Sequence, residues 1–484
     1  MSKMSKRTKT LLFSLVGLAV LGGVLAALLY TAPETEESSS APDSTVSLLS
    51  KSADDLVSLT VKNESGSIDF VRSGDDFSVV SLEDIPLNNP RVQNTTRGLV
   101  AMVASQTAEE NASNLSKYGL DAPWASAAAV YADGSTFEVK LGSDAAGVDG
   151  IYAMVSGDQN VYVLPTSYRT TFSYSLTDYV KMIITPEVDS SKTLVDTLRL
   201  SGSSYAQPIE LKVVDDEEDL ASSFGVVSHM ITAPKHSEMD IDRGAAMMAS
   251  LFAMSGNAVA EVNFDDATYE AYGFSEPFAK AEVSYQTDEA EGLKNLTITV
   301  AKGEDGTLYA VVDDIKVIYV VDEEEWMTTS YADIVSGLFF LPYINEVSKV
   351  TVSWPGESYE FSISTKTTTN DNGTEVSENT IRFGDDTLDT DKFKLFYRLL
   401  ISATNDGGFV EGVEPEGTPV LSIRYDYSAG GEPDVLSFYE GPTRKVYVSK
   451  NGTIDFTMKS SFVDKVKAAC PVMAENGEVD PDWN

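Results

Sequence analysis

Two hexapeptides of this chain follow one pattern: Tyr118-Gly119-Leu120-Asp121-Ala122-Pro123 and Tyr272-Gly273-Phe274-Ser275-Glu276-Pro277. A second tyrosine, Tyr131 or Tyr285, follows thirteen residues after the first tyrosine in both places. It stands at the end of a run rich in alanine and valine that is typical of a strand. The chain therefore contains an internal repeat, and the hexapeptides mark equivalent points in its copies.

Each hexapeptide indicates the end of a short helix. Gly119 and Gly273 can take the left-handed backbone conformation without a Cβ clash, as the residue after a helix commonly does. The next residue, Leu120 or Phe274, is expected to fold back onto the last turn, and the closing proline prevents the helix from resuming. Tyr118 and Tyr272 either line a ligand groove or pack against the helix end, and we favour packing.

The composition limits the classes of partner. The chain has 484 residues, 42% of them hydrophobic, which suggests about three or four domains of ~100–200 residues. It carries 35 Lys and Arg against 75 Asp and Glu, a net charge of −40. Such a charge disfavours phosphate backbones and excludes nucleic acid as a partner. Cys470 is the only cysteine, so there is no intramolecular disulfide and no multi-cysteine zinc site.

Residues 11–30 form an uncharged run of twenty residues, long enough to span the ~30 Å of a bilayer core as a helix. Four basic residues precede the run and acidic residues follow it, which places the N-terminus in the cytoplasm and the bulk of the chain outside. A cleaved secretory signal is the alternative, but the run is long and ends in a poor cleavage site. Residues 1–30 are therefore interpreted as a basic tip and a membrane anchor, and residues 31–52 as a flexible stalk.

Residues 53–186 are predicted to form the first of three units. Alternating hydrophobic and polar residues predict a meander of strands between Leu56 and Val80. A helix is expected to begin at Asn89 and to reach Val103, and further strands follow the Tyr118 turn.

Units two and three, residues 187–345 and 346–484, keep this order. In unit two Asp240 is predicted to cap a helix with one face formed by Ile241, Ala245, Met248 and Phe252. In unit three Asp389 or Thr390 is predicted to cap a helix with Phe393, Phe396, Leu399 and Leu400 facing inward. The hexapeptide there is reduced to Glu411-Gly412-Val413-Glu414-Pro415. The predicted fold class is α+β: tandem units, each an antiparallel sheet with a covering helix, behind one N-terminal transmembrane helix.

The anchor, the meander, the helix and the Tyr-Gly-Leu-x-x-Pro turn resemble a bacterial domain of unknown function, the 4340 family. The later pairs Asp133-Gly134, Leu141-Gly142 and Ile151-Tyr152 and the triplet Val161-Tyr162-Val163 add to this resemblance. Residues 187–345 resemble a second copy, with Val317-Ile318-Tyr319 in the corresponding place. Members are often encoded beside ABC transporters of the gliding-motility type. The resemblance implies an extracytoplasmic accessory role and supplies no catalytic residues.

Candidate metal and catalytic residues are sparse. His229 and His236, seven residues apart in a stretch without a clear period, are interpreted as exposed loop residues, because zinc sites need three or four ligands at closer spacing. Acidic clusters occur at residues 215–219, 322–325 and 385–391, with a further loop at residues 370–373. None has the full spacing of a calcium loop, so solvated turns are the preferred interpretation. The motifs of nucleophilic and zinc hydrolases are missing from the sequence.

We therefore expect a non-enzymatic, membrane-anchored, extracytoplasmic accessory or scaffold component of an envelope ABC-transport complex. A cell-wall glycan or peptide binding module is the alternative, and a calcium-dependent hydrolase is the weakest one. No catalytic, cofactor-binding or metal-binding residues are predicted. The expected partners are the membrane, through residues 11–30, and other envelope or ABC-transporter proteins.

Overall fold

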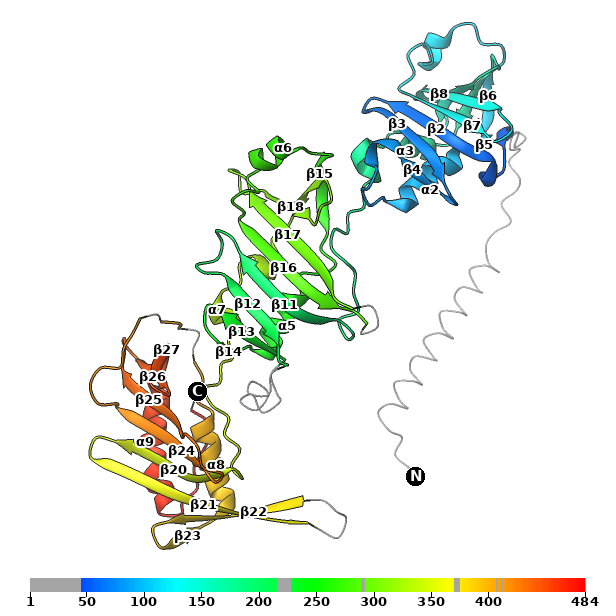
Figure 1. Ribbon diagram of the computed structural model, residues 1–484. Helices are drawn as coiled ribbons and strands as arrows, with labels where there is room; N and C mark the ends of the chain where they lie inside the picture. Colours follow the sequence, from blue (N-terminus) through cyan, green and yellow to red (C-terminus); the bar gives the residue numbers. More distant parts are fainter. Residues whose placement is uncertain are drawn as a thin grey trace, which may run out of the picture. The chain divides into compact units, whose positions relative to one another are not determined.

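The computed structural model describes residues 45–215, 228–288, 292–369, 375–405, 408–410 and 412–483 (Figure 1). The predicted anchor at residues 11–30 and residues 31–44 of the stalk lie outside this part. Among the described helices, none combines the length and the apolar character that crossing a membrane requires. The chain divides into two compact units, and from here on the names unit 1 and unit 2 refer to these and not to the three predicted units. Unit 1 ends at Tyr179, and unit 2 comprises Asp84–Asn88 and everything from Val180 onward.

Antiparallel sheets dominate both units, with few helices, as the predicted α+β class requires. The sheet of unit 1 has the order β4-β3-β2-β7-β8-β9-β10-β6. Its strands are β2 (Leu56–Asn63), β3 (Gly66–Ser73), β4 (Asp76–Val79), β6 (Gln106–Glu109), β7 (Ala125–Tyr131), β8 (Thr136–Asp144), β9 (Ile151–Val155) and β10 (Val161–Leu164). The other elements are β1 (Val46–Ser50), which pairs with β5 (Ala101–Ala104), the helices α2 (Asn89–Gly98) and α3 (Ser167–Phe172), and the 3-10 turns η1 (Ala53–Asp55), η2 (Val80–Leu82), η3 (Leu115–Tyr118) and η4 (Leu176–Tyr179).

The first helix is shorter than predicted, because α2 ends at Gly98 and does not reach Val103. Glycine is a poor helix residue, and the following residues Ala101–Ala104 gain backbone hydrogen bonds by pairing with β1. Val103 consequently lies in a strand, where its side chain is 44% exposed, and does not belong to a buried helix face.

Unit 2 contains two sheets, and the first has the order β14-β13-β12-β11-β16-β17-β18-β19-β15. Its strands are β11 (Leu194–Ser201), β12 (Ile209–Val213), β13 (His229–Ala233), β14 (Ser237–Glu238), β15 (Gly256–Val262), β16 (Ala279–Gln286), β17 (Lys294–Lys302), β18 (Leu308–Val312) and β19 (Val317–Val321). The helices are α5 (Ile241–Ala249), α6 (Asp266–Ala271) and α7 (Tyr331–Ile334), with η5 (Glu325–Met327) between β19 and α7.

Asp240 caps α5 as predicted, since its carboxylate accepts the backbone N–H of Arg243 at 3.0 Å. The predicted face of the helix is confirmed only at Met248, which is buried. Gly244 and Met247 are buried beside it, whereas Ile241 is 42% exposed and Ala245 is exposed as well. Gly244 packs so closely against Met239 that a Cβ there would clash with the methionine side chain, and this contact fixes which side of the helix faces inward.

The second sheet of unit 2 has the order β23-β22-β21-β20-β24-β25-β26-β27. Its strands are β20 (Val347–Trp354), β21 (Glu357–Thr369), β22 (Glu375–Phe383), β23 (Asp386–Leu388), β24 (Leu421–Tyr427), β25 (Asp434–Glu440), β26 (Lys445–Lys450) and β27 (Thr453–Lys459). The helices α8 (Thr390–Ile401) and α9 (Ser461–Ala474) lie on one face of this sheet (Figure 1). The predicted face of α8 is confirmed: Asp389 caps the helix, and Phe393, Phe396, Leu399 and Leu400 are buried.

The three sheets share one strand order up to the last strand, which precedes the final meander in the chain in the first two sheets (β6 and β15) and follows it in the third (β27). In each, a meander leads through a helix to a strand that pairs on the opposite side of the first strand. A register shift interrupts that pairing at the same point in all three, and the affected pairs are Leu56 with Tyr131, Val195 with Tyr285 and Val347 with Tyr427.

Candidate functional site

The two hexapeptides build the helix ends that the sequence predicts. Gly119 follows η3 with φ 68° and ψ 18°, and the N–H of Leu120 donates to the carbonyl of Leu115 at 3.1 Å. Leu120 then packs with Tyr118 and Val161 in a buried cluster.

In the second hexapeptide Gly273 has φ 89°, and the N–H of Phe274 donates to the carbonyl of Tyr269 at 3.3 Å. Phe274 is buried with Phe264 and Ile318. The apolar residue after the glycine therefore closes the turn in both copies.

Both motif tyrosines have packing roles in these clusters. Tyr118 is 2% exposed, and its hydroxyl donates to Glu109 and accepts from the Nζ of Lys117 at 2.7 Å. The hydrogen bond from Tyr118, followed by that from Lys117, lowers the pKa of the Glu109 carboxyl below its ordinary value. Tyr272 is half-buried against Phe274. Pro123 and Pro277 are half-buried beyond each turn.

The interpretation of His229 as an exposed loop residue is wrong. It lies in β13 and is buried, with Nε2 2.7 Å from the carbonyl oxygen of Val195 and Nδ1 3.0 Å from the hydroxyl of Ser228. Burial lowers the pKa of the imidazole. His236 is exposed, as predicted. The two histidines therefore have different environments.

Metal ligands do not gather within the described ranges, where no three His, Cys, Asp or Glu side chains lie close enough to hold an ion. Residues 216–219 and the loop at 370–373 lie outside the described part. In the 322–325 cluster, burial raises the pKa of Glu324 and the charge of Asp322 adds to the effect.

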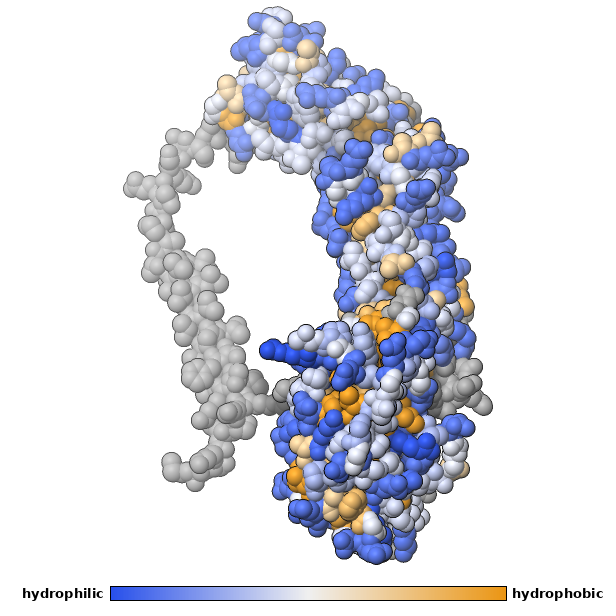
Figure 2. Space-filling view, turned by 90° about the vertical axis from the view of Figure 1, so that its left-hand side faces the viewer, coloured by the Kyte–Doolittle hydropathy of each residue, from blue (hydrophilic) through white to orange (hydrophobic). Residues whose placement is uncertain are grey.

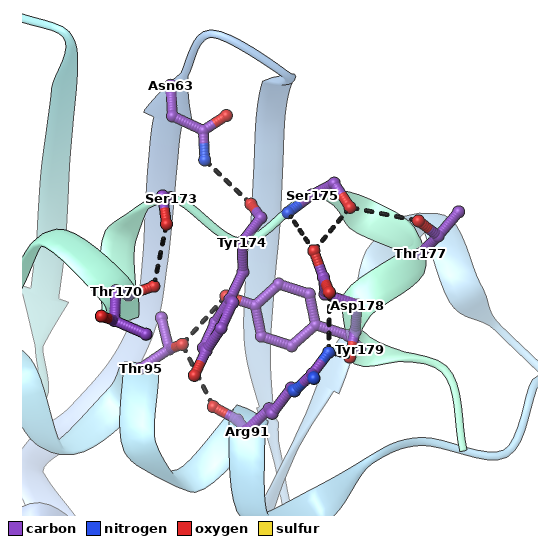
Figure 3. A network of polar contacts seen from close by, with 10 residues as sticks. All are labelled: Asn63, Arg91, Thr95, Thr170, Ser173, Tyr174, Ser175, Thr177, Asp178 and Tyr179. Atoms are coloured by element: carbon purple, nitrogen blue, oxygen red, sulfur yellow. Dashed lines mark hydrogen bonds and ion pairs between the residues drawn. The ribbon is translucent and has the colours of Figure 1, made fainter. Parts of the chain in front are cut away.

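Unit 1 contains a network of polar residues that are joined to one another by hydrogen bonds and an ion pair (Figure 3). Nη1 of Arg91 donates to the carboxylate of Asp178 at 2.7 Å and to its backbone carbonyl at 2.8 Å. The hydroxyl of Ser175 reaches the same carboxylate at 2.7 Å. Partial burial raises the pKa of Asp178, but the bonds from Ser175 and the attraction of Arg91 outweigh it, so the pKa lies below its ordinary value.

The hydroxyls of Thr95 and Tyr179 lie 2.9 Å apart in the same network, and Nδ2 of Asn63 donates to the carbonyl of Tyr174 at 2.8 Å. These contacts attach residues 174–179, at the end of unit 1, to helix α2 and strand β2 (Figure 3). We interpret the network as structural, because the Asp178 carboxylate and the hydroxyls of Thr95 and Tyr179 are bonded to other groups of the chain.

A cavity with a volume of about 790 Å³ lies in unit 2. We call it the linker groove. Its apolar lining consists of Met230, Met239, Ile241, Leu338, Phe339, Phe340 and Leu341. Its acidic lining consists of Glu238, Asp240, Asp242 and Asp434, with His236 and Lys450 as the basic side chains. A second cavity of about 250 Å³ shares His236, Glu238, Leu338 and Lys450 with it.

The connection between the two sheets of unit 2 forms the groove. The N–H of Asp240 donates to the carbonyl of Ile334 at 2.7 Å, and the N–H of Ser336 donates to the carbonyl of Glu238 at 2.8 Å. The N–H of Asn405 donates to the carbonyl of Gly337 at 2.9 Å. Residues 334–337 are therefore hydrogen-bonded to the segment around Asp240 on one side and to Asn405 on the other. Leu338 and Leu341 follow in the chain and are 41% and 42% exposed.

The polar groups of the groove are paired in part. The hydroxyl of Tyr427 donates to Asp434 at 2.6 Å, and Nδ2 of Asn451 donates to the same carboxylate at 3.0 Å. Burial, and then the bond to Asp434, raise the pKa of Tyr427. Burial likewise raises the pKa of Glu238, against the attraction of Lys450. Nζ of Lys450 lies 4.9 Å from the ring centre of Phe340.

The groove thus combines an apolar floor with an excess of carboxylates. Such a lining can bind a cationic, partly apolar group, because apolar contact and charge complementarity act together there. Sequence reasoning missed this site, since its residues come from five separate segments with no common spacing. The sequence signal that was available is the segment around Leu338 and Leu341, which has too few polar residues for an ordinary loop.

The comparisons with known proteins give one match. Residues 78–277 match the model of a family described as a domain of unknown function, DUF4340. The matched range contains both hexapeptides. Neither a curated protein nor a solved structure matches the chain.

Proposed function

We propose, on the premise that residues 78–277 belong to the DUF4340 family, that this chain is a non-enzymatic accessory or scaffold protein of the cell envelope. Residues 11–30 anchor it, and the remainder lies outside the membrane beside an ABC transporter. The linker groove is its binding site for a partner protein. The family description assigns no activity, so the argument for the function comes from the groove.

Tandem copies of one module support the scaffold part of this proposal. The segments that follow the first and the second sheet make the same backbone contacts. In each segment, one residue pairs with a residue just before a helix, and a later residue pairs with one after the corresponding helix of the following sheet. The bridges before the helices are Leu87 with Val180 and Met239 with Val335, and those after the helices are Ile183 with Ser255 and Leu338 with Thr404.

The hydrogen bonds beside these bridges repeat as well. Lys181 N–H donates to the carbonyl of Pro86, and Ser336 N–H to that of Glu238, both at 2.8 Å. Gly256 N–H donates to Met182 at 2.7 Å, as Asn405 N–H does to Gly337 at 2.9 Å. Equivalent bonds at equivalent positions are best explained by duplication of one module with its connection.

The observation that carries the binding function is the combination of exposed leucines and carboxylates in the linker groove. Leu338 and Leu341 are exposed, and Glu238 and Asp434 line the same cavity. The face drawn in Figure 2 is largely hydrophilic, with hydrophobic residues in patches among the hydrophilic ones. An acidic groove with an apolar floor favours a basic, partly apolar segment of a partner protein as the occupant.

Glycan binding is the second candidate, and one observation bears on it. Trp354, Tyr359 and Phe383 form a row of half-buried aromatic rings across β20, β21 and β22. Adjacent rings stack with centres 5.4 Å and 6.0 Å apart and planes inclined by 25° and 23°. Since Tyr359 has a ring on each side and the other two rings each contact Tyr359, less ring face is left to stack on a sugar. This favours a protein ligand over a glycan.

A peptide titration tests the binding function. The full chain in detergent is titrated against a fluorescent twelve-residue peptide of alternating lysine and leucine, with a glutamate and leucine peptide for comparison. The double variant Glu238→Gln/Asp434→Asn is expected to bind the lysine peptide roughly ten-fold more weakly, about 1.4 kcal/mol.

The matched control is Glu276→Gln/Glu304→Gln, which removes two exposed carboxylates outside the groove. It changes the net charge equally and is expected to leave the affinity unchanged. Equal losses in both double variants would show that only the overall charge of the chain attracts the peptide. A calcium titration that raises the thermal stability would instead revive the calcium-dependent hydrolase.

A further inference from the structure

Strands β21 and β22 extend past the sheet to which they belong. β20 pairs with β21 only over Glu357–Ser362, and β23 pairs with β22 only over Ile381–Phe383. Beyond these points β21 and β22 pair with each other, from Ser364 with Thr380 to Thr369 with Glu375. We call residues 364–369 and 375–380 the arm. Figure 1 shows it projecting from its sheet.

The arm is ordered by its own contacts. Oγ1 of Thr365 donates to Oδ1 of Asn379 at 2.8 Å, and the hydroxyls of Thr367 and Ser377 lie 3.0 Å apart across the two strands. At its base, Nδ2 of Asn379 donates to Oδ1 of Asn345 at 2.9 Å. These bonds hold the ribbon straight where it leaves the sheet.

Both outer edges of the arm lack a strand partner among the described residues. Its side chains are largely exposed on both faces, and Val376 is 43% exposed. A two-stranded ribbon is marginal in water, and an unpaired edge is a template for another strand. Threonine, which dominates the β21 half, favours strands. The arm is therefore built to gain a further strand.

We infer that the arms of two copies of this chain pair edge to edge through β21, antiparallel, about a two-fold axis at Thr367. Thr367 then faces Thr367 of the partner subunit, and Thr365 faces Thr369 of the partner subunit. Lys366 faces Thr368 of the partner subunit. No like charges stand directly opposite, and threonine pairs across strands are favourable. The result is a four-stranded sheet with the symmetry that most dimers have.

The charges of the arm favour the β21 edge over the β22 edge. The β21 half carries one charge, Lys366, and Glu378 stands opposite it within the same hairpin. The β22 half carries Glu375 and Glu378 in a chain whose net charge is already −40. Pairing through β22 would bring the Glu378 carboxylates of both copies to the central two strands, whereas pairing through β21 keeps them on the outside.

Disulfide trapping tests the inference, and the chain suits it because its one cysteine, Cys470, is buried. Residues directly opposite in an antiparallel pair have Cα atoms ~4.5–5.5 Å apart, which lies within the range of a disulfide. The variant Thr367→Cys, in the detergent-solubilised full chain, is expected to form a covalent dimer on mild oxidation at least about ten times faster than Ser275→Cys. Ser275 is exposed in the second hexapeptide, away from the arm.

A second pair of variants reports the association itself. Thr367→Glu places two carboxylates opposite each other on the axis, so light scattering is expected to show a fall from dimer to monomer. Val376→Glu, on the outer strand, is expected to leave the dimer intact. Equal crosslinking at residues 367 and 275 would overturn the inference. So would a monomeric unsubstituted chain, or crosslinking of Thr367→Cys to a different protein but not to itself.

Discussion

The ring of Tyr118 packs edge-on against the ring of Tyr152, with centres 4.7 Å apart and planes at 73°. The same relationship recurs between Tyr272 and Tyr309, at 4.9 Å and 82°. Tyr152 lies in β9 and Tyr309 in β18, which hold the same place in the strand order of their sheets. The tyrosine of each hexapeptide thus contacts a second tyrosine on the equivalent strand of its sheet.

Double-mutant cycles test this equivalence. Replacing Tyr118 and Tyr152 by leucine, singly and together, is expected to give a coupling free energy of about 0.5–1.5 kcal/mol, because edge-on rings gain that much beyond their buried area. The cycle at Tyr272 and Tyr309 is expected to give a value of the same size. Urea unfolding of the full chain measures both. A coupling in one copy only would contradict a shared role.

Replacing Gly119 and Gly273 by alanine separates two costs, namely backbone strain at a positive φ and steric clash of the added Cβ. Both glycines have a positive φ, so either alanine costs about 1–2 kcal/mol in the left-handed conformation. A Cβ at residue 119 would also lie 2.9 Å from the backbone nitrogen of Ser143, whereas residue 273 has open space. Gly119→Ala is therefore expected to lower the free energy of unfolding more than Gly273→Ala. Thermal unfolding of the two variants decides the order.

Gly142 in β8 leaves room for the backbone of the first hexapeptide because it has no side chain. A Cβ there would lie 2.1 Å from the carbonyl oxygen of Tyr118. Gly142→Ala is expected to cost about 1–3 kcal/mol by overpacking. Register places Ala301 at the equivalent position, because Leu141 pairs with Ala125 as Val300 pairs with Ala279.

Ala301→Gly is the matched control for Gly142→Ala. It removes one methyl group from the second copy and frees its backbone, which is expected to cost only about 1 kcal/mol. Chemical denaturation compares the two variants. A Gly142→Ala variant as stable as the unsubstituted chain would show that the turn does not rest on this strand.

The pH dependence of stability follows from Glu238. Burial raises its pKa above the ordinary value of 4.5, so the folded chain holds this proton more tightly than the unfolded chain does. Stability therefore falls as the pH rises from 4.5 through the folded pKa. His229 acts in the opposite sense, because its pKa is lowered from 6.5 by burial and stability falls as the pH drops through this range.

Glu238→Gln removes the first contribution. The melting temperature of this variant is expected to lose less than that of the unsubstituted chain as the pH rises from about 4.5 to neutrality. Glu276→Gln, at an exposed position, is expected to retain the original profile. Parallel melting profiles for Glu238→Gln and the unsubstituted chain would contradict the effect of burial.

Sequence reasoning succeeded where the determinants are local. Gly119 and Gly273 end their helices because a left-handed residue followed by an apolar one is a short-range signal. The face of α8 could also be predicted, because four large apolar residues recur at helical spacing after Asp389.

The errors have physical reasons. Gly98 lies within an otherwise regular helical pattern, and the competing strand partner of the next segment, β1, is distant in the sequence. His229 begins a strand of only five residues, too short for a clear period of two. The linker groove depends on how residues 334–338 pair with two other segments, and such pairing leaves no pattern in any one stretch.

Photo-crosslinking in the native envelope tests the proposed function most directly. A benzoylphenylalanine at position 341 lies in the linker groove, and one at position 71 lies on the exposed side of β3 in unit 1. On irradiation, we predict that position 341 attaches to a subunit of an ABC transporter, identified by mass spectrometry, and that position 71 does not. Attachment only to cell-wall material, or identical products at both positions, would contradict the account.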